Sequence, residues 1–195
     1  MSAFTQTLRR FAHHHDEMPA FHAGYLVITF LIAALFNLGV FAMLIAAHMS
    51  LDYVKYSEVH EFSFRKTLKG MFFESLIDIM LLSVALVFAV YLHYAAGLIA
   101  LSGLLRAEQT ILRAFGTLVP KLEILHHVYV DFVDVKHHMN SLPEEMMKGW
   151  TMVDKVCAFC AVAALLLVAL APYLLSLDQA NFTQILQDQL IPWNL

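Results

Sequence analysis

Two short stretches of the sequence repeat one pattern of residue types that suits metal chemistry. One begins at His48 and the other at His127, and each reads histidine, three residues, aspartate, aromatic residue, valine. Residues four apart share one face of an α-helix, so His48 with Asp52 and His127 with Asp131 each present an imidazole and a carboxylate together. Such ligands suit zinc, manganese or iron. The repeat therefore predicts a divalent-metal site built from two helices.

A third pair with the same spacing, Glu74 and Asp78, lies at the start of an apolar stretch. An acid inside a membrane helix costs about 2.5–3.5 kcal/mol on insertion scales unless it is paired or hydrated, and it is a functional hypothesis by default. Two structural roles stay open for this pair. The side chains could lie in the headgroup zone, or they could pair with Arg106 or Arg113.

Five residues of ligand type fall within about 80° of arc on a helix predicted over 121–140. None is lysine or arginine, and they are Glu123, His127, Asp131, Asp134 and His138. The alternative is that this stripe is the solvated face of an interfacial helix. In this composition chance gives about one histidine with an acid four residues later. The chain has three such pairs, because His13 with Glu17 adds to the pairs that begin at His48 and His127.

The composition places the chain among membrane proteins. Of its 195 residues 60% are hydrophobic and 14% are charged, whereas a soluble domain is about 45–50% apolar and about 25% charged. The net charge of -4 excludes the basic surface that nucleic acid requires. Two cysteines within an apolar run do not make a disulfide scaffold. No repeat or linker divides the chain, so we expect one domain over 1–195.

Charge-free runs over 18–51, 79–105 and 156–177 set the expected membrane helices, because a bilayer core needs roughly 20 apolar residues. We expect an all-α integral membrane protein, a bundle of about four membrane helices plus amphipathic interfacial helices. The membrane helices are predicted over 20–48, 71–92, 94–118 and 152–176, with a turn near Tyr91–Tyr94 and a break at Gly116 and Pro120. An amphipathic cytoplasmic helix is predicted over 121–140 and an interfacial helix over 179–191.

The basic residues favour four passes through the cell membrane, or three passes plus a half-inserted helix over 94–118 that does not cross, with both chain ends outside. Ten of the twelve then lie on the cytoplasmic side, as the positive-inside rule prefers. In that arrangement the candidate ligands could converge at the cytoplasmic face; they are His48, Asp52, Glu74, Asp78, His127 and Asp131. With three passes the two repeated pairs would lie on opposite sides of the membrane.

The histidine and aspartate spacing at a membrane helix resembles, in that fragment, the metal-site helices of cation diffusion facilitator zinc transporters. It also resembles the helix-end motif of some bacterial membrane-bound metal-dependent hydrolases. The cytoplasmic domain of the transporters and the further histidine motifs of the hydrolases are not found in this sequence. No function is therefore carried over from either family.

Two functions from different classes follow from these patterns. The first is a membrane protein that binds a divalent transition metal (zinc, manganese or iron), either to transport it or to activate water for hydrolysis. The leading ligands are His48, Asp52, Asp78, His127 and Asp131, followed by Glu74, Glu123, Asp134 and His138. The second is a non-catalytic scaffold or accessory subunit whose charged residues pair helices. Expected partners are the lipid bilayer and further membrane subunits, either copies of this chain or other proteins.

Overall fold

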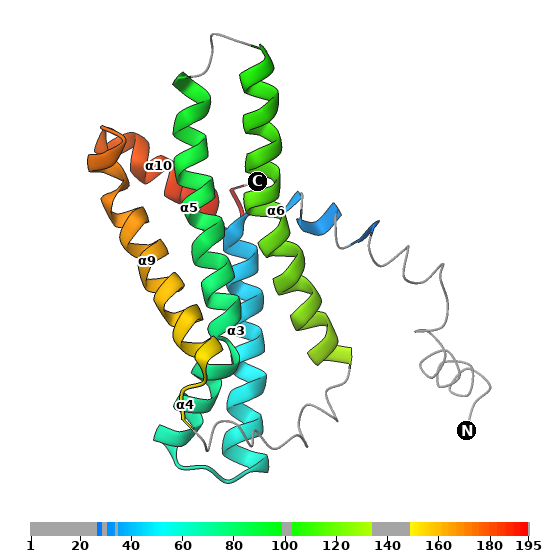
Figure 1. Ribbon diagram of the computed structural model, residues 1–195. Helices are drawn as coiled ribbons and strands as arrows, with labels where there is room; N and C mark the ends of the chain where they lie inside the picture. Colours follow the sequence, from blue (N-terminus) through cyan, green and yellow to red (C-terminus); the bar gives the residue numbers. More distant parts are fainter. Residues whose placement is uncertain (1–26, 29–30, 34, 99–102, 134–148, 195) are drawn as a thin grey trace, which may run out of the picture.

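The chain folds into a bundle of helices in the computed structural model (Figure 1). The structure describes residues 27–28, 31–33, 35–98, 103–133 and 149–194, and no β-strand occurs among them. The all-helical prediction is confirmed for these residues. In chain order the elements are α3 (Leu38–Val54), the π-helical turn η2 (Lys55–Val59), α4 (Phe64–Glu74), α5 (Leu76–Leu98), α6 (Gly103–Val133), α9 (Met152–Leu174) and α10 (Gln179–Leu190).

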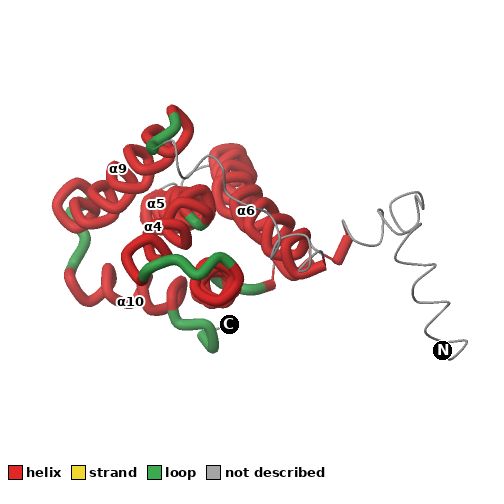
Figure 2. Tube along the Cα trace, turned by 90° about the horizontal axis from the view of Figure 1, so that it is seen from below, coloured by secondary structure: helices red, strands yellow, loops and turns green. Residues whose placement is uncertain are grey.

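Apolar packing holds helices that are distant in the sequence side by side. Seen along the bundle, α5 lies between α9 and α6 (Figure 2). Leu38, Ala89 and Ala171 belong to one buried cluster that joins α3, α5 and α9. Phe41 and Ile124 belong to a second cluster that joins α3 to α6. The second cluster fixes the part of α3 that precedes His48 against the part of α6 that precedes His127.

The first predicted membrane helix, over 20–48, is wrong as an uninterrupted segment. The helix that carries His48 begins at Leu38, and the residue before it, Asn37, adopts an extended backbone. The Asn37 side chain accepts a hydrogen bond from the Val40 amide at 3.3 Å, and such a cap competes with continued helix. At its other end α3 runs past His48 and continues through η2 to Val59.

The second predicted membrane helix, over 71–92, is two helices. The chain bends by 51° between α4 and α5, at Ser75, which leaves the helical conformation and is fully buried. The turn predicted near Tyr91–Tyr94 is also wrong, because α5 continues to Leu98. Asp78 therefore lies in the first turn of α5, beside the bend.

The region predicted as a membrane pass over 94–118 and a separate helix over 121–140 contains one long helix, α6, with Pro120 in its interior. Proline in a helix removes one backbone hydrogen bond, and here the helix continues through it. Gly116, one turn before, lies so close to α5 that a Cβ atom would overlap the Phe88 ring. The helix α6 thus packs closely against α5 and continues where the local signals predicted a break.

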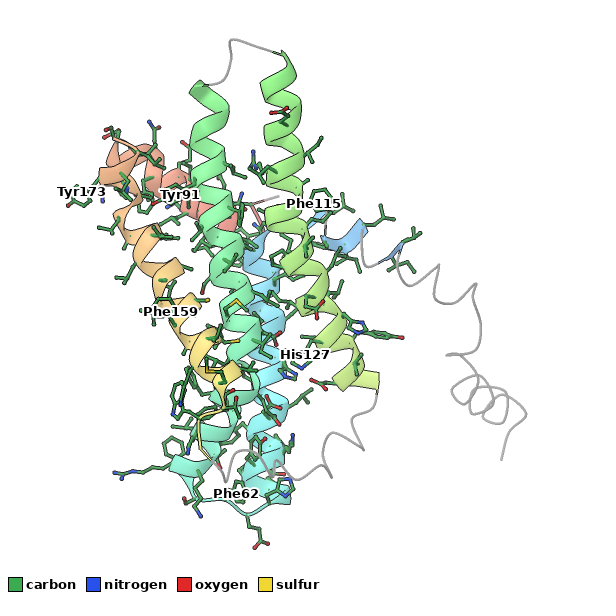
Figure 3. The ribbon with its side chains drawn as sticks, viewed as in Figure 1. Phe62, Tyr91, Phe115, His127, Phe159 and Tyr173 are labelled. Carbon is green, nitrogen blue, oxygen red and sulfur yellow. The ribbon has the colours of Figure 1, made fainter. Side chains whose placement is uncertain are left out.

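Among the residues that the structure describes, two helices are long and apolar enough to cross a membrane, or three if α4 and α5 count as one bent span; the two are Leu38–Glu58 and Met152–Leu174. These two or three candidate membrane helices do not establish the four that the sequence predicted. The helix α9 starts with a capping box formed by Thr151 and Asp154, and its Phe159 and Tyr173 side chains project away from the bundle (Figure 3). The helices α9 and α10 occupy the regions predicted over 152–176 and 179–191.

Candidate metal centre

The two repeated pairs of the sequence face each other in the bundle. His48 and Asp52 belong to the second half of α3, and His127 and Asp131 belong to the last turns of α6. Figure 3 shows His127 in the lower half of the bundle, on the side of α6 that meets α3. The His48 and His127 ring centroids are 5.2 Å apart. Because both helices carry the pair at i and i+4, their packing brings four polar side chains into one place.

Asp131 lies between the two histidines. Its Oδ2 atom is 3.3 Å from Nδ1 of His48 and 3.6 Å from Nε2 of His127. One ligand atom from each of these three residues lies within 4.8 Å of the others. In a tetrahedral zinc site with bonds of about 2.1 Å, neighbouring ligand atoms lie about 3.4 Å apart. The distances from Asp131 to the two histidines match this spacing, and all three ligand atoms lie within 4.8 Å of one another.

A second carboxylate holds the opposite nitrogen of each imidazole. Nδ1 of His127 lies 3.1 Å from Oδ1 and 3.2 Å from Oδ2 of Asp78. Nε2 of His48 lies 3.5 Å from Oδ2 of Asp52. The contact between Asp52 and His48 is longer and electrostatic. The Asp78 carboxylate accepts the proton of Nδ1 of His127 and leaves the lone pair of the other nitrogen available to a metal. In both rings that other nitrogen faces Asp131.

The protonation of His127 follows from its contacts. The hydrogen bond to Asp78 is the largest cause that raises the pKa of His127 to about 8, burial acts against it, and the charges of Asp78, Asp131 and Asp52 add to the rise. In the absence of a metal, His127 thus carries a positive charge at neutral pH. A bound cation would take the place of that proton.

The centre is closed on one side and open on the other. His48, Asp52 and Asp78 are at most 1% exposed, whereas Asp131 is 16% exposed and His127 is 38% exposed. Buried carboxylates and imidazoles are costly unless they are paired or bind a metal. The centre therefore reaches solvent at His127, while Nδ1 of His48 and Oδ2 of Asp131 are buried.

Glu74, a further carboxylate of the sequence prediction, has another partner. Its Oε1 atom accepts a hydrogen bond from the Lys55 ammonium group at 2.7 Å, and Tyr56 and Asp52 lie beside the same carboxylate. Lys55 is 1% exposed, so its charge is neutralised inside the bundle by Glu74. Glu74 thus pairs with Lys55 and does not belong to the group formed by His48, His127 and Asp131.

Of the remaining predicted ligands, only Glu123 lies in the described part of the chain, and it does not join the cluster. Glu123 is exposed on α6. Asp134 and His138 lie outside the described residues. Sequence reasoning missed the buried Lys55 and Tyr56, which follow Asp52 by three and four residues. The signal that could have revealed Lys55 was its position one helical turn after Asp52. A lysine on that side of the helix would pair with a nearby carboxylate.

Comparison with known proteins adds no further information on this site. No protein-family model, no curated protein and no solved structure matches the chain. The functional argument therefore rests on the geometry of the side chains.

Proposed function

We propose that the protein is a divalent-metal-binding membrane protein whose ligands are His48, His127 and Asp131. The observation that supports this most strongly is the arrangement of five side chains, in which two imidazoles share one carboxylate and each is backed by another. Two nitrogens and one oxygen as ligands favour zinc, with manganese and iron as the other candidates. Asp52 and Asp78 orient the rings in this proposal and do not bind the ion.

The proposed use of the ion is to activate water for hydrolysis. Structural zinc sites have four protein ligands, whereas catalytic sites have three and keep one position for water or substrate. Three protein ligands and an exposed edge at His127 match the second type. The ion would lower the pKa of its water and supply a hydroxide at neutral pH. Transport of the ion is the other use, and uptake of zinc into proteoliposomes distinguishes the two.

Metal analysis of the purified protein tests the proposal directly. We expect about one equivalent of zinc per chain after dialysis against trace zinc. His127→Ala and Asp131→Asn should lose the metal. His126→Ala and Glu123→Gln are matched controls on the same helix, with exposed side chains, and they should retain it. The absence of stoichiometric metal, or equal loss in the control variants, would exclude the metal centre.

A second function has an observation of its own. The same side chains link α3, α5 and α6 by short polar contacts that require no ion, as expected for a scaffold or an accessory subunit of a larger membrane complex. Under this hypothesis Asp131→Asn lowers the melting temperature equally with and without zinc. Under the metal hypothesis the loss of stability is larger in the zinc-loaded protein, because the variant also loses the stability that a bound ion adds by mass action.

We further propose four passes through the cell membrane, with the metal centre near the cytoplasmic face. Both chain ends then lie outside, and the exposed apolar side chains of α9 face lipid or a neighbouring membrane subunit. A fluorescent-protein fusion and an alkaline phosphatase fusion at the C-terminus test this orientation. Only the phosphatase fusion should be active, and the reverse result would refute the orientation.

A further inference from the structure

A cavity of about 750 Å³ opens where the start of α3 meets α6 and the C-terminal tail. Arg113, Thr117 and Lys121 line it from α6, and their spacing of four residues places them on one helical face. Asn37, the residue before α3, and Trp193, in the C-terminal tail after Leu190, also line it. Sites for small molecules have volumes of about 300–1,000 Å³, so the cavity is large enough for a small organic ligand.

The cavity gathers positive charge that the described residues do not neutralise. The Lys121 side chain is 8% exposed, and its ammonium group donates hydrogen bonds to the backbone oxygens of Ala33 and Phe36, at 3.2 and 2.7 Å. Arg113 is half-buried on the same face. Within the described part of the chain no carboxylate lies within ion-pair distance of either cation, although the exposed Asp188 also lines the cavity.

Two further observations point to an anion in this cavity. Burial first, and then the positive charge of Arg113, lower the pKa of Lys121, so the two cations are close enough to repel each other. The cavity also adjoins the N-terminus of α3, where the helix dipole presents its positive end. An anion between the two cations would relieve their repulsion and benefit from the dipole.

The walls of the cavity include apolar side chains next to the cations. Leu35, Phe36 and Ala89 line it together with the Trp193 ring. Such walls suit the apolar part of a ligand whose charged group is held by Arg113 and Lys121. Buried apolar side chains around Phe41 and Ile124 lie between this cavity and the metal centre, so the two sites are separate.

We propose that the cavity binds a phosphate group carried on an apolar substituent. Two positive charges match a dianion best. The planar guanidinium of Arg113 can bind phosphate oxygens through two parallel hydrogen bonds, while Lys121 acts as a point charge. The phosphate could belong to a lipid head group or to a soluble phosphate ester. The proposal does not depend on the metal centre.

Ligand titration of the full chain in neutral detergent tests the proposal. The probes are phosphatidic acid, inorganic phosphate and, as an uncharged control, diacylglycerol. Arg113→Gln should weaken binding of the phosphate probe by about 10- to 100-fold, the value of a hydrogen bond to a charged group. Arg65→Gln removes an exposed arginine on α4 and should leave binding unchanged. Removal of zinc with a chelator should also leave it unchanged, which excludes phosphate bound at the metal centre.

The outcomes separate the two sources of phosphate. Tighter binding of phosphatidic acid than of inorganic phosphate supports a phosphate on an apolar substituent, and binding of phosphatidic acid alone assigns a lipid head group. Equal binding of the two probes would show that the apolar walls contribute nothing and would overturn the apolar substituent. Arg113→Lys keeps the positive charge and loses the planar guanidinium, so this variant should bind the phosphate probe with intermediate affinity. It serves as a second variant if Arg113→Gln does not fold. Failure of both phosphate probes to bind, or an equal loss in Arg65→Gln, would overturn the proposal.

Discussion

Replacement of Asp78 by asparagine is the sharpest test of how the metal centre works. Asp78 touches His127 through both carboxylate oxygens and is 1% exposed, so water cannot take its place. An asparagine amide can turn its NH₂ group toward Nδ1 of His127. The ring proton then moves to Nε2, which is the nitrogen that faces Asp131, and the lone pair for the metal is lost.

The expected size of this effect follows from the geometry. Loss of a carboxylate behind a metal-binding histidine typically weakens metal affinity by about 10- to 100-fold, which corresponds to about 1.4–2.8 kcal/mol. Because both oxygens of Asp78 are engaged, we expect Asp78→Asn in the upper part of this range. Asp52 is 3.5 Å from His48, beyond the usual length of a strong hydrogen bond, so Asp52→Asn should cost less. Asp131→Asn should cost most, because it removes a ligand.

The assay is a competition titration against a chromophoric zinc chelator, in detergent and at a fixed pH above 8, where His127 is neutral. Glu123→Gln serves as the control for a lost acid on α6. The predicted order of zinc affinities is wild type, Asp52→Asn, Asp78→Asn and Asp131→Asn. An Asp78→Asn affinity within about threefold of wild type, or a larger loss in Asp52→Asn, would refute this account of the centre.

Three other predictions follow from the structure. Removal of zinc with a chelator should lower the melting temperature, since an ion present at 100 times its Kd adds about 2.7 kcal/mol to the free energy of unfolding; an unchanged melting temperature would contradict this. Zinc affinity should fall as the pH drops below about 8, because a proton then competes for His127; calorimetric titrations at several pH values would show it, and a flat profile would not fit. Gly39→Ala should destabilise the protein by about 1–3 kcal/mol, since its Cβ would overlap the backbone oxygen of Leu190; thermal unfolding measures the change, and an unaltered transition would mean that the C-terminal tail moves freely.

Local physical rules account for what could be predicted from the sequence. Residues four apart must share a helical face, so each histidine and aspartate pair was predictable without a fold. The apolar composition requires burial in lipid or in a core, so an all-helical chain with membrane-length helices was predictable too. Helix boundaries were harder. Asn37 interrupts a charge-free run by capping α3, and Pro120 lies inside α6 because packing against α5 outweighs its lost hydrogen bond.

The tertiary structure decided which of these residues meet. His48 and His127 come from helices far apart in the sequence, and only the packing of Phe41 against Ile124 and their neighbours sets the level at which the helices face each other. The same packing gives different partners to carboxylates of similar chemistry. Asp131 lies between two imidazoles, whereas Glu74 pairs with Lys55. Spacing along one helix fixes the direction of a side chain, and the contacts between helices fix its partner.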